Sequence, residues 1–225
     1  SEESFKYLVL AGECALKAGD ARTALGLWGM VVRNNPGHEQ AQEKIVQFYL
    51  DQSNLFGGRS WSQLQTEAQK LCQIAESKGA KNYVGIHALG RALIEQRAID
   101  EKNVERGLQM LIEAVNGDQS NPEYANSLAQ HYFREKQFDK AEDIFNLLLS
   151  GDHLPESAVD QSTAYRSRGI YYLSRKINDQ ELLRQQQRRQ VPPDQLAALR
   201  QQIADADTRA FQDLQKAVDL APQDV

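Results

Sequence analysis

Residues 5–36 read FKYLVLAGECALKAGDARTALGLWGMVVRNNP. Apolar residues recur at three- and four-residue spacing on both sides of Gly19-Asp20, which predicts two amphipathic helices joined by a short turn. Gly19 can adopt the left-handed conformation that ends the first helix, and Asp20 can cap the second. Pro36 disfavours helix at the residue before it and closes the segment. We therefore expect a helical hairpin here.

The predicted contact stripe of this hairpin is made of small residues, namely Ala11, Gly12, Ala15 and Ala24. Small side chains allow two helices to approach closely, and Trp28 is expected to fill the core beside them. A single hairpin cannot bury its own apolar face, so more hairpins should follow.

This stretch resembles a tetratricopeptide repeat, a unit of about 34 residues with a large-xx-Leu-Gly-xx-Tyr, Ala-xxx-Phe and Pro pattern. The matching positions, in order, are Leu8, Ala11-Gly12, Ala15, Gly19, Ala24, Trp28 and Pro36. Ala11 and Ala15 are smaller than the family usually carries. The resemblance implies an all-α fold, a right-handed α-solenoid of antiparallel helix pairs, and a non-catalytic role as a scaffold for protein–protein interaction.

Similar units follow along the chain. Leu89-Gly90 and Leu128-Ala129 stand at the Leu-Gly position of later repeats, and Phe145 stands at the Phe position of the fourth. We expect one solenoid over residues 1–225, with approximate units 4–37, 38–78, 82–118, 122–155 and 158–222. Gly57-Gly58 is interpreted as a flexible connector, because no Gly-Lys-Ser/Thr ending and no strand accompany it. The loop 97–103 is longer than the family's.

The fifth unit contains a helical insertion over residues 179–203, in which Pro192-Pro193 separates two segments without other helix breakers. The simplest prediction is one repeat whose two helices are elongated into a projecting hairpin, the first running from about Ala158 to Gln190. The alternative function is a regulatory or assembly subunit that acts through this hairpin, by self-association or nucleic-acid contact. The candidate residues are Leu182, Arg184, Arg188, Leu196 and Leu199.

In the family that the chain resembles, the first helix of each repeat lines a concave groove. Carried over, this implies the partner-binding residues His87, Arg91, Asn126, Gln130, Arg134 and Arg166, with Lys6, Val9, Glu13 and Ile170 on the same face. Arginines bind carboxylates and side-chain amides pair with peptide backbone, so the expected partner is a protein or an extended peptide. The alternative is a solvated helix face. A chaperone clamp is disfavoured, because Val9 and Glu13 stand where that subset has Lys and Asn.

Composition excludes several other classes of function. A net charge of −5 and the lack of aromatics among Arg184, Arg188 and Arg189 argue against nucleic-acid binding. No apolar run is long enough to span a membrane. The four histidines lack metal-ligand spacing and no nucleophile elbow is present, so we expect no enzyme activity, small-molecule substrate, cofactor or metal. Glu142-Asp143 is interpreted as a pair of exposed charges.

Cys14 and Cys72 lie among apolar residues at helical spacing, and we expect both to be buried thiols. The chain begins at Ser1 and ends near a repeat boundary, which suggests a piece of a longer array. The location of the parent protein therefore stays open, slightly favouring the cytoplasm.

Overall fold

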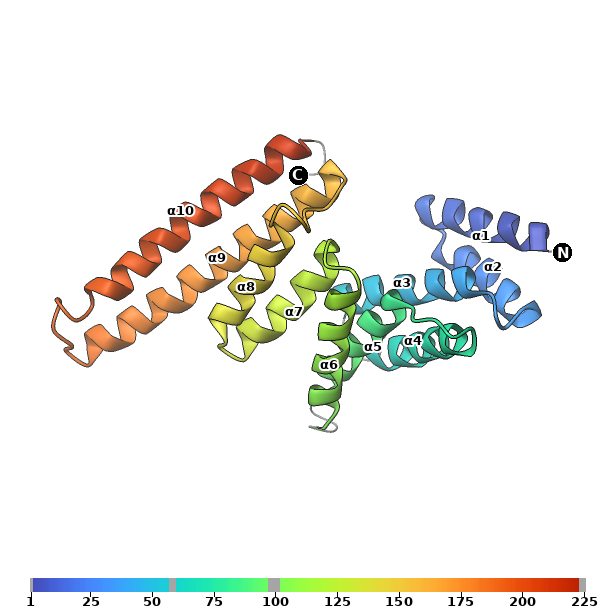
Figure 1. Cartoon of the computed structure of the whole chain (residues 1–225), viewed down its shortest axis with the longest axis horizontal. Coiled ribbons are helices and arrows are strands. Elements are labelled where there is room, and N and C mark those ends of the chain that lie inside the picture. The colour runs from blue at the N-terminus through green and yellow to red at the C-terminus, as the bar shows by residue number, and fades with distance from the viewer. Residues whose placement is uncertain (1, 57–59, 97–101, 223–225) are drawn as a thin grey trace. The chain divides into compact units, whose positions relative to one another are not determined.

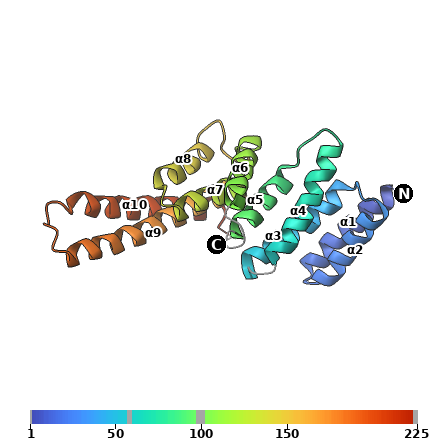
Figure 2. The ribbon, with the colours of Figure 1, turned by 90° about the horizontal axis from the view of Figure 1, so that it is seen from below.

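The protein is all α-helical in the part that the computed structural model describes, residues 2–56, 60–96 and 102–222. Within these ranges there is no β-strand, and ten helices follow one another as antiparallel pairs (Figures 1 and 2). The pairs are α1 (Glu2–Lys17) with α2 (Ala21–Asn34), α3 (Glu39–Phe56) with α4 (Ser60–Ser77), α5 (Tyr83–Glu95) with α6 (Lys102–Gly117), α7 (Pro122–Arg134) with α8 (Phe138–Leu148), and α9 (Ala158–Arg188) with α10 (Ala197–Leu220). The predicted all-α repeat fold is confirmed. Gly57-Gly58 and most of the 97–103 loop lie outside the described residues.

The chain divides into two compact units, Ser1–Gly117 with α1 to α6 and Asp118–Val225 with α7 to α10. None of the described helices is both long enough and apolar enough to cross a membrane.

The first helix pair forms as its sequence predicts. Asp20 caps α2, because its side chain accepts a hydrogen bond from the Thr23 amide at 3.0 Å, and Gly19 takes a φ of 83° in the turn. Trp28 is only 1% exposed and lies directly against Gly12, where any Cβ would collide with the indole ring. Its Nε1 donates to the Val9 carbonyl oxygen at 3.1 Å. The predicted core role of Trp28 is confirmed.

Successive pairs in the first unit are joined through buried side chains. Ile45 and Phe48 of α3 belong to the same hydrophobic cluster as Trp28. Gln42 of α3 is buried and donates to the Glu67 carboxylate of α4 at 2.9 Å. Helices α5 and α6 approach most closely where Gly90 lies against Gly107. These contacts make the first unit a stack of helix pairs.

The second unit is dominated by the long hairpin of α9 and α10. Helix α9 has 31 residues and is therefore about 46 Å long, which agrees with the predicted elongated hairpin. Gly169 packs against Leu214, and the Arg168 guanidinium forms two hydrogen bonds with the Asp213 carboxylate, at 2.7 and 2.8 Å. The Ser162 hydroxyl donates to the Ala217 carbonyl oxygen at 2.8 Å. The two helices are thus fixed along their base.

The exposure of Cys14, Val9 and Leu196 differs from the prediction. Cys14 is exposed, because α1 is covered mainly by α2 and its other face meets solvent. Val9, expected on the groove surface, is buried against Trp28. Leu196, expected on the exposed side of the hairpin, is buried where the turn after Pro193 folds back. Cys72 is buried as predicted, and burial raises the pKa of its thiol to about 11.

Replacing Trp28 with alanine should lower the free energy of unfolding by about 3 to 5 kcal/mol, because it removes a fully buried indole and leaves a cavity. The measurement is denaturant unfolding followed by far-ultraviolet circular dichroism. Tyr7→Ala is the matched control on the same helix pair, since Tyr7 is 65% exposed and should change stability by less than about 0.5 kcal/mol. A loss below about 1 kcal/mol for Trp28→Ala would contradict the packing described here.

Candidate functional site

A groove between α7 and α9 is the candidate site in the second unit. It encloses a cavity of about 280 Å³. Its lining residues are Asn126, Ala129, Gln130, Phe133 and Arg134 of α7, Phe145 of α8, and Ser167, Ile170, Tyr171 and Ser174 of α9. Both helices are the first members of their pairs, which is the position where the sequence predicts a binding surface.

The α7 wall is polar because its capping residues set the register of the helix. The Asn121 side chain accepts hydrogen bonds from the amides of Glu123 and Tyr124, and Pro122 occupies the first turn. Four-residue spacing then places Asn126, Gln130 and Arg134 on one face. The Gln130 amide donates to the Asn126 side-chain oxygen at 3.3 Å.

The floor of the groove is apolar and aromatic. Ala129, Phe145 and Tyr171 are buried, and Phe133 meets the Tyr171 ring edge to face with centroids 5.9 Å apart. The Tyr171 hydroxyl donates to the Phe138 carbonyl oxygen at 3.0 Å. Burial, followed by the charge of Glu142, raises the pKa of Tyr171 to about 12, so this floor stays uncharged at neutral pH. Ile170 is 52% exposed at the rim.

The charge that lines the groove is positive. Arg134 is the single charged residue that lines the cavity, and no Asp or Glu is among the lining residues. Ser167 and Ser174 add hydroxyl groups on the α9 wall, and the exposed Arg166 precedes Ser167. The groove therefore offers an apolar floor, amide and hydroxyl walls, and a positive end.

The structure brings only some of the predicted groove residues together. Asn126, Gln130 and Arg134 share the cavity, and Arg166 lies on α9 beside it. Arg91 belongs to the first unit, where its guanidinium donates to Asn54 at 2.8 Å and lies 5.4 Å from the centre of the Trp61 ring.

His87 was predicted to line the groove, and this prediction is wrong. It is only 1% exposed, because α5 packs against α3, α4 and α6, so the imidazole is inside the first unit. Burial, with a smaller contribution from Arg91, lowers its pKa from 6.5 to about 3. A neutral, buried imidazole presents no surface to a partner.

Phe133, Tyr171 and Ser174 were missed by the sequence analysis. The signal was present in part, because Phe133 directly precedes the predicted Arg134 and Tyr171 directly follows Ile170. Phe133 and Tyr171 each lie one position away from a predicted groove residue, whereas Ser174 lies four positions after Ile170. A search for apolar residues beside the predicted groove residues could have found the floor.

The predicted hairpin residues lie toward the turn that joins α9 to α10. Leu182, Arg184 and Arg188 are exposed near the end of α9, Leu199 is half-buried, and Leu196 is buried. Arg184 lies 3.7 Å from the Glu181 carboxylate.

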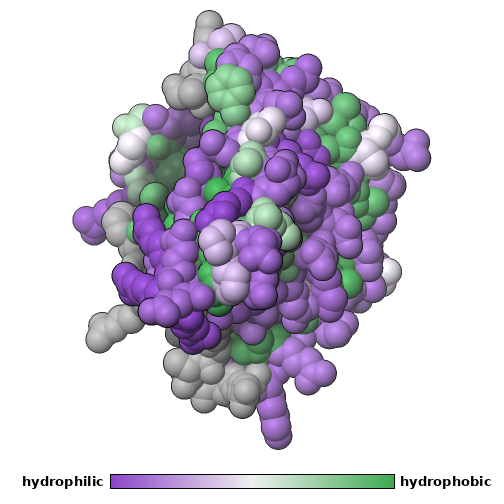
Figure 3. Space-filling model, turned by 90° about the vertical axis from the view of Figure 1, so that its left-hand side faces the viewer, coloured by the Kyte–Doolittle hydropathy of each residue, from purple (hydrophilic) through white to green (hydrophobic). Residues whose placement is uncertain are grey.

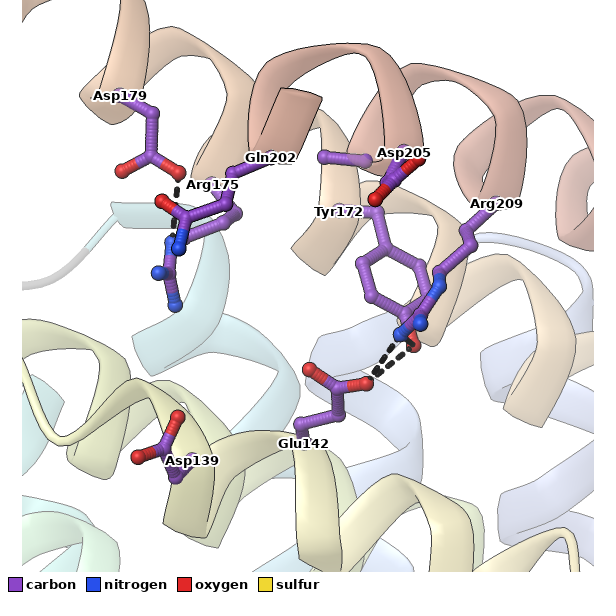
Figure 4. Close-up of a pocket in the computed structure, with 9 residues that line it drawn as sticks. Asp139, Glu142, Tyr172, Arg175, Asp179, Gln202, Asp205 and Arg209 are labelled. Atoms are coloured by element: carbon purple, nitrogen blue, oxygen red, sulfur yellow. Dashed lines mark hydrogen bonds and ion pairs between the residues drawn. The ribbon is translucent and has the colours of Figure 1, made fainter. Parts of the chain in front are cut away.

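A second cavity, of about 220 Å³, lies between α8 and the α9/α10 hairpin (Figure 4). Figure 4 shows Arg209 and Tyr172 meeting Glu142 of α8, while Arg175 points toward Asp179. Arg175 also lies 4.1 Å from the centre of the Phe138 ring. Glu142 is therefore not the exposed charge that was predicted, since it ties α8 to both hairpin helices. The paired charges indicate a structural role for this cavity.

The described residues contain no group of three or more His, Cys, Asp or Glu side chains that could hold a metal ion. The histidines, whose sequence spacing predicts no metal site, also do not converge on either cavity. The polar groups at the α7–α9 groove are suited to hydrogen bonding and charge pairing.

The chain is similar in fold to solved structures of repeat proteins. It matches a crystal structure of MamA with a TM-score of 0.57 at 16% identity, covering 92% of this chain and 96% of that one. A second MamA structure gives a TM-score of 0.53 at 15% identity, covering 99% and 94%. YrrB, described as a TPR protein with an unusual peptide-binding site, gives 0.46 at 13% identity, covering 96% and 86%.

No protein-family model and no curated protein sequence matches this chain. TM-scores of 0.57 and 0.53 to MamA support a shared fold, and the helix pairs have the small-residue contacts that the repeat pattern predicts.

The buried His87 should make the first unit sensitive to acid. Its folded-state pKa of about 3 lies below the ordinary 6.5, so the unfolded chain binds a proton that the folded chain does not. This contribution to stability is complete above pH 6.5 and is lost as pH falls toward 3, by up to about 1.4 kcal/mol per pH unit. His87→Leu should reduce that slope in denaturant unfolding measured between pH 6 and 4.

The imidazole itself provides the control for this prediction. In an NMR titration of the wild-type protein, the His87 ring should stay neutral throughout the range in which the protein is folded. A midpoint near 6.5 for this ring would show that it is solvated, contrary to its position here.

The chain has a tetratricopeptide repeat fold.

Proposed function

We propose that this protein is a non-catalytic interaction scaffold that holds an extended peptide segment of a protein partner in the α7–α9 groove. The observation that carries the proposal is the composition of the groove wall. Asn126 and Gln130 stand at four-residue spacing above a buried aromatic floor, and Arg134 is the single charged group lining the cavity.

An extended peptide presents backbone N–H and C=O groups that lose water when it binds. Side-chain amides carry both a donor and an acceptor, so Asn126 and Gln130 can replace those lost hydrogen bonds. Their present bond to each other is 3.3 Å long, at the weak end of the hydrogen-bond range, and is easily exchanged.

The floor supplies the apolar part of the affinity. A cavity of about 280 Å³ accommodates one large side chain of the peptide, which would contact Phe133, Ile170 and the Tyr171 ring. Burying such a side chain is worth about 1.5 to 3 kcal/mol. Arg134 would favour a carboxylate next to this anchor, through a charge-assisted hydrogen bond. The preferred segment is therefore a large apolar residue followed or preceded by an acidic one.

The test is selection from a displayed peptide library with the wild-type protein, followed by affinity measurements on the recovered peptides. Gln130→Ala combined with Arg134→Ala should weaken their binding at least about tenfold, because it removes the amide and the guanidinium that hold the segment. Stability should change by less than about 0.5 kcal/mol, since both side chains are exposed.

Asp143→Ala is the matched control, because Asp143 is exposed on α8 and is not among the residues that line the groove. It should bind the selected peptides as the wild type does. Recovered peptides that bind the double variant unchanged would place the interaction elsewhere and overturn the proposal. So would a selection that enriches no peptide at all.

A further inference from the structure

Exposed large hydrophobic side chains are concentrated in the first and last helix pairs. Among the described residues, α1/α2 carries Tyr7, Leu10, Leu16 and Met30, and α9/α10 carries Val159, Ile170, Ile177, Leu182, Phe211 and Val218. Only Leu55 lies between these two groups. Isolated exposed hydrophobic residues are ordinary on protein surfaces, but groups of them mark interaction surfaces.

The exposed residues of α1 form one stripe, which we call the α1 face: Tyr7, Leu10 and Cys14. They follow each other at three- and four-residue spacing, so they share one side of the helix. Val9 and Gly12 contact Trp28 of α2 on the opposite side. Tyr7 is 65% and Leu10 is 54% exposed.

A second stripe runs over α9 and α10, and we call it the hairpin face: Val159, Ile170, Ile177, Phe211 and Val218. Their separations of eleven and seven residues keep each set on one side of its helix. In the part of the chain that the structure describes, this face is exposed.

The hairpin face points away from α8. Arg175 and Arg209 face α8, where they contact Phe138 and Glu142. Ile177 and Phe211 each follow one of these arginines by two positions, which is a rotation of about 200° around the helix. The exposed apolar residues of both helices therefore lie on the side of the hairpin opposite to α8. Figure 2 shows α8 on one side of α9 and α10. By contrast, the view in Figure 3 is mainly hydrophilic, with hydrophobic side chains in small groups.

Inside the first unit, apolar faces of successive helix pairs are buried against each other, as where Ile45 and Phe48 of α3 join the Trp28 cluster. The α1 face and the hairpin face have the same character but are exposed. We propose that copies of this protein associate head to tail, with the α1 face of one copy on the hairpin face of the next. This contact repeats the packing of successive helix pairs and goes beyond the peptide groove.

The α1 face is shorter than the hairpin face. From Tyr7 to Cys14 it spans about 10 Å, while the segment from Val159 to Ile177 spans about 27 Å, so the hairpin face can receive the α1 face over its whole length. Only three side chains of α1 take part, so the interface is expected to be smaller than the standard specific interface of about 1,600 Å². Association should therefore be weak, with dissociation constants of roughly micromolar size or above.

A contact between two different faces leaves one free face at each end, so it builds open chains of copies unless a ring closes. This property distinguishes it from a symmetric dimer. Leu10→Glu blocks the α1 face but leaves the hairpin face intact, and Phe211→Glu does the reverse. Each variant alone should be monomeric, and an equimolar mixture should form a one-to-one dimer and nothing larger.

The experiment is sedimentation velocity of the full chain under reducing conditions, because Cys14 is exposed on the α1 face. Wild-type protein should sediment faster as its concentration rises from about 1 to 300 µM, a range that covers weak association. Leu55→Glu is the matched control, since Leu55 is 73% exposed on α3, belongs to neither face, and should associate like the wild type. Circular dichroism establishes that each variant is folded.

Three results would overturn the proposal: wild-type protein that stays monomeric at the highest concentration, a Leu10→Glu variant that associates like the wild type, or a mixture of the two variants that stays monomeric. If the wild type associates but the mixture of the two variants stays monomeric, the contact between copies is symmetric. Leu10→Glu and Phe211→Glu leave every residue that lines the groove unchanged, so peptide binding can be measured on either variant in the absence of association. A failure of the peptide proposal can therefore be distinguished from a failure of this one.

Discussion

The close approach of two helices at a residue without a side chain sets the geometry of three pairs, α1/α2, α5/α6 and α9/α10. At Gly90 and Gly107 the approach is reciprocal, since a Cβ on either glycine would lie 2.9 or 2.8 Å from the carbonyl oxygen of the other. At Gly169 a Cβ would lie 2.8 Å from Leu214. Such contacts are shorter than atoms tolerate, so larger residues would push the helices apart and shift every layer packed on them.

The groove follows from this spacing together with the alternation of first and second helices. Helices α7 and α9 are each held by their own partner, and the space between them is floored by Phe145 from α8. Arg168, paired with Asp213, and Tyr172, bonded to Glu142, hold α9 against α10 and α8. Because these bonds lie on the sides of α9 that face its neighbours, its remaining side is free to line the groove.

Much of this arrangement could be predicted from the sequence, because helix periodicity, caps and small residues are local signals. The pairs around Gly12, Gly90 and Gly169 and the long α9 were found in this way. His87 was misplaced because a polar residue on a first helix was assigned to the surface, whereas α5 is enclosed by three other helices. Leu196 was misplaced because the turn that buries it has no periodic pattern. Burial that results from contacts between segments distant in the sequence leaves no pattern in the local sequence.

The two proposed surfaces meet at one residue. Ile170 lines the α7–α9 groove and also belongs to the hairpin face, because a residue at the edge of α9 borders both. A copy packed over Ile177 and Phe211 would approach the rim of the groove at Ile170. Binding at one surface would then change the affinity of the other, and this coupling must be equal in both directions. If the α1 face of a neighbouring copy covers Ile170, the peptide loses part of its apolar floor and the two partners compete. If it stops short of Ile170, the neighbour extends the floor and the two partners support each other. The position of this single isoleucine between two surfaces therefore determines whether assembly restricts or favours capture of the peptide.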